Sequence, residues 1–163
     1  MDGGERAADW APQISVQSED FDIGAEMARL TEGRLEIGAV ASFTGLVREI
    51  GGAGKLSGME LEHYPGMTER ALSQIAAEAA ERWPLAGLRL IHRVGPLAPG
   101  DRIVLVLAAS RHRQAAFDAA AFVMDYLKTR APFWKRETTA DGGAVWVDAR
   151  DSDTTAADKW QAR

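Results

Sequence analysis

Five side chains of this sequence combine basic character with a spacing that suggests chemistry. They are Arg48, His112, Arg113, Lys128 and Lys135. Such groups bind anionic oxygens, and the free amides at a helix N-terminus strengthen that binding. The two lysines bracket 131–134, an apolar connection that contains a proline. A lysine packed against apolar groups is partly desolvated, so its neutral form is favoured and it can act as a base or a nucleophile.

Each of these residues also has an ordinary structural explanation. Arg48 follows a strand pattern, where an exposed arginine is common. His112 and Arg113 fit a solvated first helical turn. Lys128 near a helix C-terminus is favoured by the helix dipole. The residues taken singly therefore do not decide between a site and a surface.

The composition excludes several other kinds of site. The chain has no cysteine, so disulfides, thiol nucleophiles and thiolate zinc sites are ruled out. We interpret His63 and His92, both within strand patterns, as structural, and we predict neither a metal nor a cofactor. The glycine-rich segment 51–55 suggests a phosphate-binding loop, but Leu56 stands where that loop needs serine or threonine. Neither a Ser-His-Asp triad nor a carboxylate pair is evident.

Charge is unevenly distributed along the chain. Residues 111–136 hold six basic residues and two aspartates, a net charge of +4, although the whole chain carries −5. A basic segment in an acidic protein suggests a local anion site, and a solvated helix face explains it about equally well. The overall charge argues against a general nucleic-acid binder. Since no apolar run reaches the roughly 18 residues of a membrane helix and the N-terminus lacks a secretory pattern, we expect a cytoplasmic protein without membrane contact.

The elements that must position these residues are short strands and two main helices. Strand patterns cover 14–17, 37–48, 59–64, 88–94 and 102–109. Helices are predicted at 22–30, from the N-cap Thr68 to Trp83, and from the N-cap Ser110 to before Pro132. The segment 141–143 between two further strand patterns (137–139 and 144–147) predicts a hairpin.

This order of elements predicts an α+β domain with a largely antiparallel sheet, because strands and helices do not alternate. We expect a lead-in at 1–13, one domain at 14–150, and a polar tail at 151–163 with the mobility typical of chain ends. The expected inward face of the first main helix consists of Leu72, Ile75, Ala76 and Ala79. That of the second consists of Ala116, Phe117, Ala120, Ala121, Met124 and Leu127.

The spacing of the basic residues limits how they can cooperate. His112 and Lys128 lie sixteen residues apart, which is about 24 Å along one straight helix. Either the two groups serve different sites, or one subunit supplies Lys128 while a second copy supplies His112 and Arg113.

Several segments, taken together and in this order, resemble the catalytic (large) subunit family of molybdopterin synthase. The resemblance covers roughly residues 15–150, and its last block is the most specific. The segments are 38–48, 61–67, 92–95, 110–113 and 127–137, the last reading Leu-Lys-Thr-Arg-Ala-Pro-Phe-Trp-Lys-Arg-Glu.

This resemblance implies an α/β-hammerhead fold and a homodimer at the centre of a heterotetramer. Two copies of a small ubiquitin-like sulfur carrier would insert C-terminal Gly-Gly tails that end in a thiocarboxylate. The enzyme would transfer sulfur to cyclic pyranopterin monophosphate and form the dithiolene of molybdopterin, with no cofactor of its own. A chain without cysteine is consistent with sulfur supplied by a carrier.

The resemblance also implies roles for individual residues. Those that bind the pterin phosphate or act in catalysis are Arg48, His112, Arg113, Lys128 and Lys135. Those that border the same pocket are Leu46, Val47, Arg136 and Glu137. Lys128 and Lys135 are the catalytic pair, and a second subunit would supply His112 and Arg113.

Two other functions use the same residues. A non-catalytic module that binds a phosphorylated metabolite and regulates a partner needs the cations but neither a desolvated lysine nor a carrier. A structural dimerisation domain needs only the basic helix face.

Overall fold

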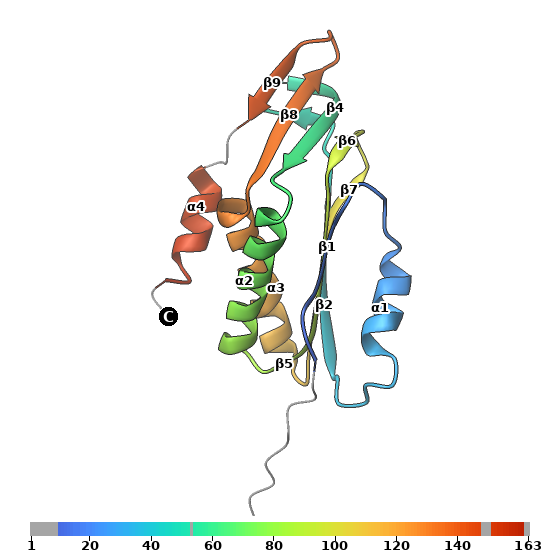
Figure 1. Cartoon of the computed structure of the whole chain (residues 1–163), viewed down its shortest axis with the longest axis vertical. Helices are drawn as coiled ribbons and strands as arrows, with labels where there is room; N and C mark the ends of the chain where they lie inside the picture. The colour runs from blue at the N-terminus through green and yellow to red at the C-terminus, as the bar shows by residue number, and fades with distance from the viewer. Residues whose placement is uncertain (1–9, 53, 148–150, 162–163) are drawn as a thin grey trace, which may run out of the picture.

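The computed structural model describes residues 10–52, 54–147 and 151–161 (Figure 1). Its elements, in chain order, are β1 (Gln13–Gln17), α1 (Ile23–Thr31), β2 (Ala39–Leu46), β3 (Ile50–Gly51), β4 (Gly54–His63), α2 (Met67–Arg82), β5 (Leu85–Arg93), β6 (Gly95–Leu97), β7 (Arg102–Ser110), α3 (Arg113–Arg130), β8 (Phe133–Thr139), β9 (Ala144–Val147) and α4 (Asp151–Asp158).

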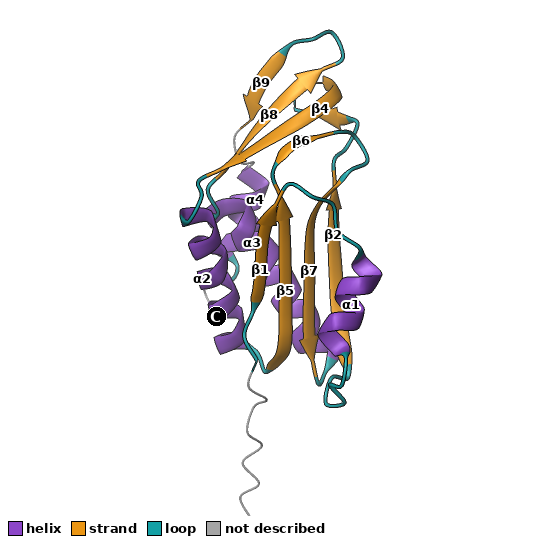
Figure 2. Cartoon of the chain, turned by 45° about the vertical axis from the view of Figure 1, so that its right-hand side comes forward, coloured by secondary structure: helices purple, strands orange, loops and turns teal. Residues whose placement is uncertain are grey.

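The larger sheet has the strand order β1-β5-β7-β2. Only β1 and β5 run parallel, and the other neighbouring strands of this sheet are antiparallel. Helix α1 lies on one face of the sheet, and α2 and α3 lie on the other (Figure 2). The central strands are therefore covered on both sides, which explains why 104–109 is a continuous run of buried apolar residues.

A second sheet extends from one end of the first and has the order β3-β4-β8-β9, with β6 paired to β4 (Figure 1). The predicted hairpin is confirmed, and Gly142 adopts the positive φ that its turn requires. The predicted single sheet is thus two sheets in a mixed α+β fold, because β4 and β8 pair with each other rather than with the central strands.

The two main helices are confirmed, although their caps differ from the prediction. The N-cap of α2 is Gly66, while the Thr68 hydroxyl accepts from the Tyr64 amide at 3.0 Å. The N-cap of α3 is His112, and Ser110 instead donates to the Pro84 carbonyl at 2.9 Å. Both hydroxyls therefore tie helix starts to neighbouring segments.

The inward face predicted for α2 is confirmed, whereas that of α3 is partly wrong. All four expected α2 residues are fully buried. On α3, Phe117 is 62% exposed and Ala121 is also exposed, while Phe122 and Val123 are buried. Helix α3 packs against the sheet, α2 and α4 together, so its buried stripe is rotated and wider than a single sheet contact requires.

The segment after residue 150, expected to be a polar and mobile tail, contains a packed helix. Helix α4 lies against α3, and Trp160, which follows α4 in the chain, is only 4% exposed. The Trp160 indole packs edge-on against Trp83 and Phe122 and donates to Asp125 at 2.7 Å. One large aromatic residue thus anchors a segment whose composition is otherwise polar.

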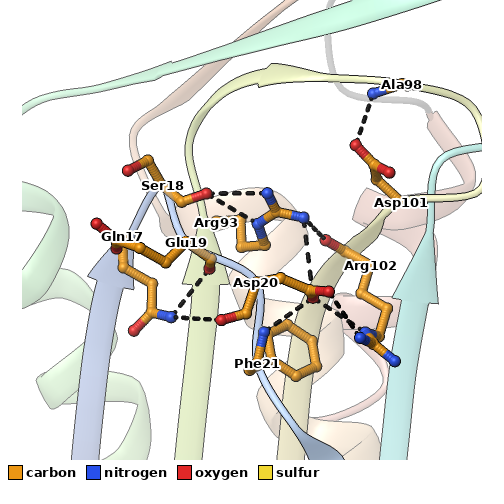
Figure 3. Close-up of polar contacts among 9 residues, drawn as sticks. All are labelled: Gln17, Ser18, Glu19, Asp20, Phe21, Arg93, Ala98, Asp101 and Arg102. Carbon is orange, nitrogen blue, oxygen red and sulfur yellow. Dashed lines mark hydrogen bonds and ion pairs between the residues drawn. The ribbon is translucent and has the colours of Figure 1, made fainter.

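A polar network fixes the strand ends next to the smaller sheet (Figure 3). Arg93, the last residue of β5, donates to the Ser18 carbonyl and to the Arg102 carbonyl at 2.9–3.0 Å. Arg102 forms a two-pronged ion pair with Asp20, and this hydrogen bonding lowers the pKa of the Asp20 carboxyl to about 2. The ends of β1, β5 and β7 are therefore held in register where the two sheets meet.

Within the described ranges, no helix is long and apolar enough to cross a membrane.

Replacing Trp160 with alanine tests the packed C-terminal segment. We expect the free energy of unfolding to fall by about 3 kcal/mol, because a fully packed indole leaves a cavity. Denaturant unfolding of the variant measures this loss. Trp146→Ala is the matched control, since Trp146 is 54% exposed and its loss leaves no comparable cavity. Equal effects from both substitutions contradict the assigned packing.

Candidate active site

A pocket of about 270 Å³ opens where the two sheets meet the C-terminal end of α3. Its apolar wall includes Val47, Leu61 and Phe133. Its polar groups are Arg48, His92, Lys128, Lys135 and Glu137. Three cationic side chains and one carboxylate thus surround a cavity of small-molecule size.

The alternation of side chains along β8 decides which of its residues face the pocket. Lys135 and Glu137 both line it, two positions apart, as a strand period of two requires. Arg136 lies between them and points to the opposite face, where it pairs with Glu60 at 3.3 Å and stands over the Trp146 ring. The expectation that Arg136 borders the pocket is therefore not met within this chain.

Glu137 is the buried carboxylate of the site. It is 1% exposed, and its Oε1 lies 3.5 Å from the Lys135 ammonium. A Cβ added at Gly51 would overlap the Glu137 carboxylate, so the backbone of the β3–β4 hairpin lies directly on it. Gly51 thus permits the close approach that seals this side of the pocket. The glycine-rich loop that fails as a phosphate-binding loop has this packing role instead.

Lys128 stands on the last turn of α3 and also lines the pocket. It is exposed in the single chain, whereas the sequence predicted a lysine desolvated by apolar neighbours. Leu127 and Ala131 line the same pocket but do not bury the Lys128 side chain. The described residues thus leave the Lys128 side chain accessible to water.

The connection between the two lysines is held from two sides. The Thr68 hydroxyl on α2 donates to the Pro132 carbonyl at 3.3 Å. Phe133 stacks on the His92 ring from β5, with centroids 3.9 Å apart and planes 19° apart. The relative positions of Lys128 and Lys135 therefore depend on contacts with both α2 and the larger sheet.

His92 lies beneath the pocket as a buried neutral imidazole. Its pKa is lowered to about 4, mainly by burial and to a smaller extent by the nearby charges on Lys128 and His63, while the bond between Nδ1 and the Arg93 carbonyl at 2.8 Å partly opposes this. The ring is 5% exposed. Sequence analysis interpreted His92 as a structural strand residue, and the strand pattern alone does not indicate that its ring borders the pocket.

His112 and Arg113 are separated from the pocket by the length of α3. They lie at its N-terminus, are exposed, and do not line the cavity. Arg113 and Lys128 are fifteen residues apart on one continuous helix, so their backbones are about 22 Å apart. One chain therefore brings together six of the nine predicted site residues: Leu46, Val47, Arg48, Lys128, Lys135 and Glu137.

The arrangement is suited to an anionic ligand and to proton transfer by a lysine. Arg48, Lys128 and Lys135 attract negatively charged oxygens. The ion pair with Glu137 holds the Lys135 ammonium in place. Among the described residues no group of three or more histidines or carboxylates is placed to hold a metal ion.

Comparison with known proteins gives a consistent result. The profile of the MoaE protein family matches residues 16–130. The molybdopterin synthase catalytic subunit of Mesorhizobium japonicum is 59% identical over 153 residues, which cover 93% of this chain and 95% of that protein.

Solved structures have the same fold. The molybdopterin biosynthesis MoaE protein from Burkholderia ambifaria superposes with a TM-score of 0.79 at 51% identity, over 94% of this chain and all of that one. A complex of subunits 1 and 2 of the molybdopterin-converting factor from Helicobacter pylori contains a chain of similar fold. Its TM-score is 0.65 at 17% identity, over 86% of this chain and 90% of that one.

The protonation of His92 is directly measurable. We expect its Hε1 resonance to titrate with a midpoint near pH 4 rather than near the ordinary value of 6.5. Because the folded pKa lies below the unfolded one, the unfolded state binds more protons as the pH falls from 6.5 to 4. Over this range the His92 contribution to the free energy of unfolding is lost, on the order of 3 kcal/mol.

Proton NMR across pH 3.5–7.5 follows the midpoint, and unfolding of His92→Phe beside the unsubstituted protein isolates the stability difference. A midpoint close to 6 contradicts the buried, neutral state.

Proposed function

The chain belongs to the MoaE family of molybdopterin synthase catalytic subunits, and we propose that the pocket between its two sheets is where this family's reaction takes place. The protein is an enzyme of molybdenum cofactor biosynthesis that converts cyclic pyranopterin monophosphate to molybdopterin by sulfur transfer. The observation that carries the assignment of the site is the convergence of Arg48, Lys128 and Lys135 on one small cavity.

The pocket residues have separate tasks in this proposal. Arg48 binds anionic oxygens of the substrate, and Leu46 and Val47 form the adjoining wall. Lys128 gives or takes the proton while the carrier-borne sulfur attacks the substrate carbon. Lys135, held by Glu137 at 3.5 Å, places the substrate and stabilises developing negative charge.

The sulfur comes from outside the chain, which has no cysteine to carry it. We propose a small ubiquitin-like carrier whose C-terminal Gly-Gly thiocarboxylate enters the pocket. The Helicobacter pylori chain of similar fold forms a protein–protein complex with a second subunit of its converting factor, which supports a two-component enzyme here. A bound carrier tail also supplies the desolvation that exposed Lys128 lacks in the single chain.

The remaining predicted residues enter through a second copy. A straight α3 holds His112 and Arg113 about 22 Å from Lys128, so a dimer in which they reach the neighbouring pocket reconciles their roles with the fold. Arg136 points to the outer face of β8, and we propose that it too contributes to the site only when two copies assemble. The hammerhead description of the fold and a heterotetramer with two carriers complete it.

Substitution of Lys128 separates catalysis from binding. We expect Lys128→Ala to reduce formation of dithiolene product by about a thousandfold or more, because the proton-transferring group is lost. Carrier affinity should stay within about threefold, since truncating one exposed side chain removes little interface.

The measurements are product formation from thiocarboxylated carrier and cyclic pyranopterin monophosphate, and carrier titration by calorimetry. Lys55→Ala is the matched control, because Lys55 is an exposed lysine of β4 that does not line the pocket. Retained turnover in Lys128→Ala refutes its assigned role, and binding without product in the unsubstituted protein favours a regulatory module.

Mixing two inactive variants tests the shared site. Lys128→Ala and Arg113→Ala each damage every pocket of their own homodimers. In a mixed dimer one pocket carries both substitutions and the other carries neither. With random exchange of subunits we expect about a quarter of the unsubstituted activity to return. Activity that stays at the level of the separate variants, after exchange is verified by native mass spectrometry, contradicts a pocket built from two chains.

A further inference from the structure

His92 is the one polar pocket residue that the proposed function leaves without a task. It belongs to β5 of the larger sheet, whereas Lys135 and Glu137 belong to β8 of the smaller one. Its ring stacks on Phe133, which immediately follows the Pro132 turn. His92 is thus a direct contact between the larger sheet and the segment that joins the two lysines.

The position of the ring is fixed by its surroundings. Nδ1 lies 2.8 Å from the Arg93 carbonyl, an acceptor, so Nδ1 carries the proton. The Arg93 guanidinium is itself tied to the Ser18 and Arg102 carbonyls (Figure 3), which immobilises the backbone beside His92. The ring can therefore rotate little without breaking either the Arg93 bond or the Phe133 stack.

This arrangement leaves a lone pair on Nε2. In a neutral imidazole with a protonated Nδ1, Nε2 is an acceptor. The ring borders the pocket, and Nε2 is not among the buried atoms that lack a hydrogen-bond partner, so a donor in the pocket can reach it. An acceptor at the edge of a pocket lined by cationic side chains has donors available to it.

Lys128 is the pocket donor whose charge acts on His92. Both residues line the cavity, and the charge on Lys128 is felt at His92, where it disfavours protonation of the imidazole. A neutral acceptor is compatible with this crowded positive site, whereas a second cation is not.

We propose that His92 is a positioning residue for Lys128: its stack on Phe133 fixes the connection between the lysines, and its Nε2 accepts a hydrogen bond from the Lys128 amine. The inference rests on the proposed function, because it assigns His92 to the work of Lys128. His92 itself transfers no proton and forms no bond to the substrate.

Two substitutions separate the stack from the acceptor. His92→Phe keeps a flat ring against Phe133 and removes Nε2, whereas His92→Gln returns a polar acceptor of similar reach. The matched control is His63→Phe. His63 lies on β4 and is the register partner of Phe133 on β8, but it does not line the pocket. Arg48 and Lys135 are unchanged in every variant.

Steady-state kinetics with saturating carrier give the first readout. We expect His92→Phe to lower kcat by about tenfold or more while KM for the pterin stays within about threefold, since a group that orients Lys128 acts on the chemical step. His92→Gln should recover part of the lost kcat, and His63→Phe should resemble the unsubstituted enzyme. An unchanged kcat in His92→Phe overturns the inference. Equal losses in His92→Phe and His92→Gln, together with equally lowered melting temperatures, show a purely structural role and also overturn it.

A second readout does not require turnover. Limited acetylation with acetic anhydride, followed by peptide mass spectrometry, measures the reactivity of each lysine amine. We expect Lys128 to react about threefold faster in His92→Phe, because a hydrogen bond to a neutral acceptor favours the ammonium form, with Lys135 unchanged and His92→Gln intermediate. Identical Lys128 rates in all variants overturn the inference even if the protein forms no product. Absence of product in the unsubstituted complex, with the Lys128 rates shifted as expected, counts against the proposed function alone.

Discussion

The turn from α3 into β8 is the constraint on which the proposed active site depends. It carries Lys128 before it and Lys135 after it, and Pro132 removes one backbone freedom between them. Thr68 holds the turn from α2, and His92 holds it from the larger sheet. Because these anchors come from different layers of the fold, the separation of the two lysines is a property of tertiary packing rather than of the local chain.

The electrostatics of the pocket follow from how little of its charge is buried. Glu137 is enclosed and has Lys135 beside it, which offsets the cost of removing a carboxylate from water. Arg48 and Lys128 remain exposed in the single chain and keep their hydration. The site thus stays positive without a large desolvation penalty until an anionic ligand replaces that water.

Local sequence patterns predicted the structure correctly where an element packs through a single face. The apolar stripe of α2 and the β8–β9 hairpin follow from spacing and turn residues, and the basic residues with the family resemblance located most of the pocket. The prediction began the last hairpin at Glu137, but β8 begins at Phe133, so the alternation that turns Arg136 outward was not visible. The rotation of α3, the packing of Trp160 and the contact of His92 with Phe133 depend on segments far apart in the sequence, which no local pattern encodes.

The straightness of α3 constrains how such a site is completed. The helix shows no break between Arg113 and Arg130, and its middle is buried against the sheet, α2 and α4, so it cannot bend to bring its two ends together. If the start of α3 binds an anion for the same reaction that Lys128 serves, as we propose, the two ends of this straight helix can meet only when two copies of the chain lie side by side. In the proposed assembly, Lys128 remains hydrated until a neighbouring chain and the carrier tail exclude water from it, so that assembly itself prepares the lysine for chemistry.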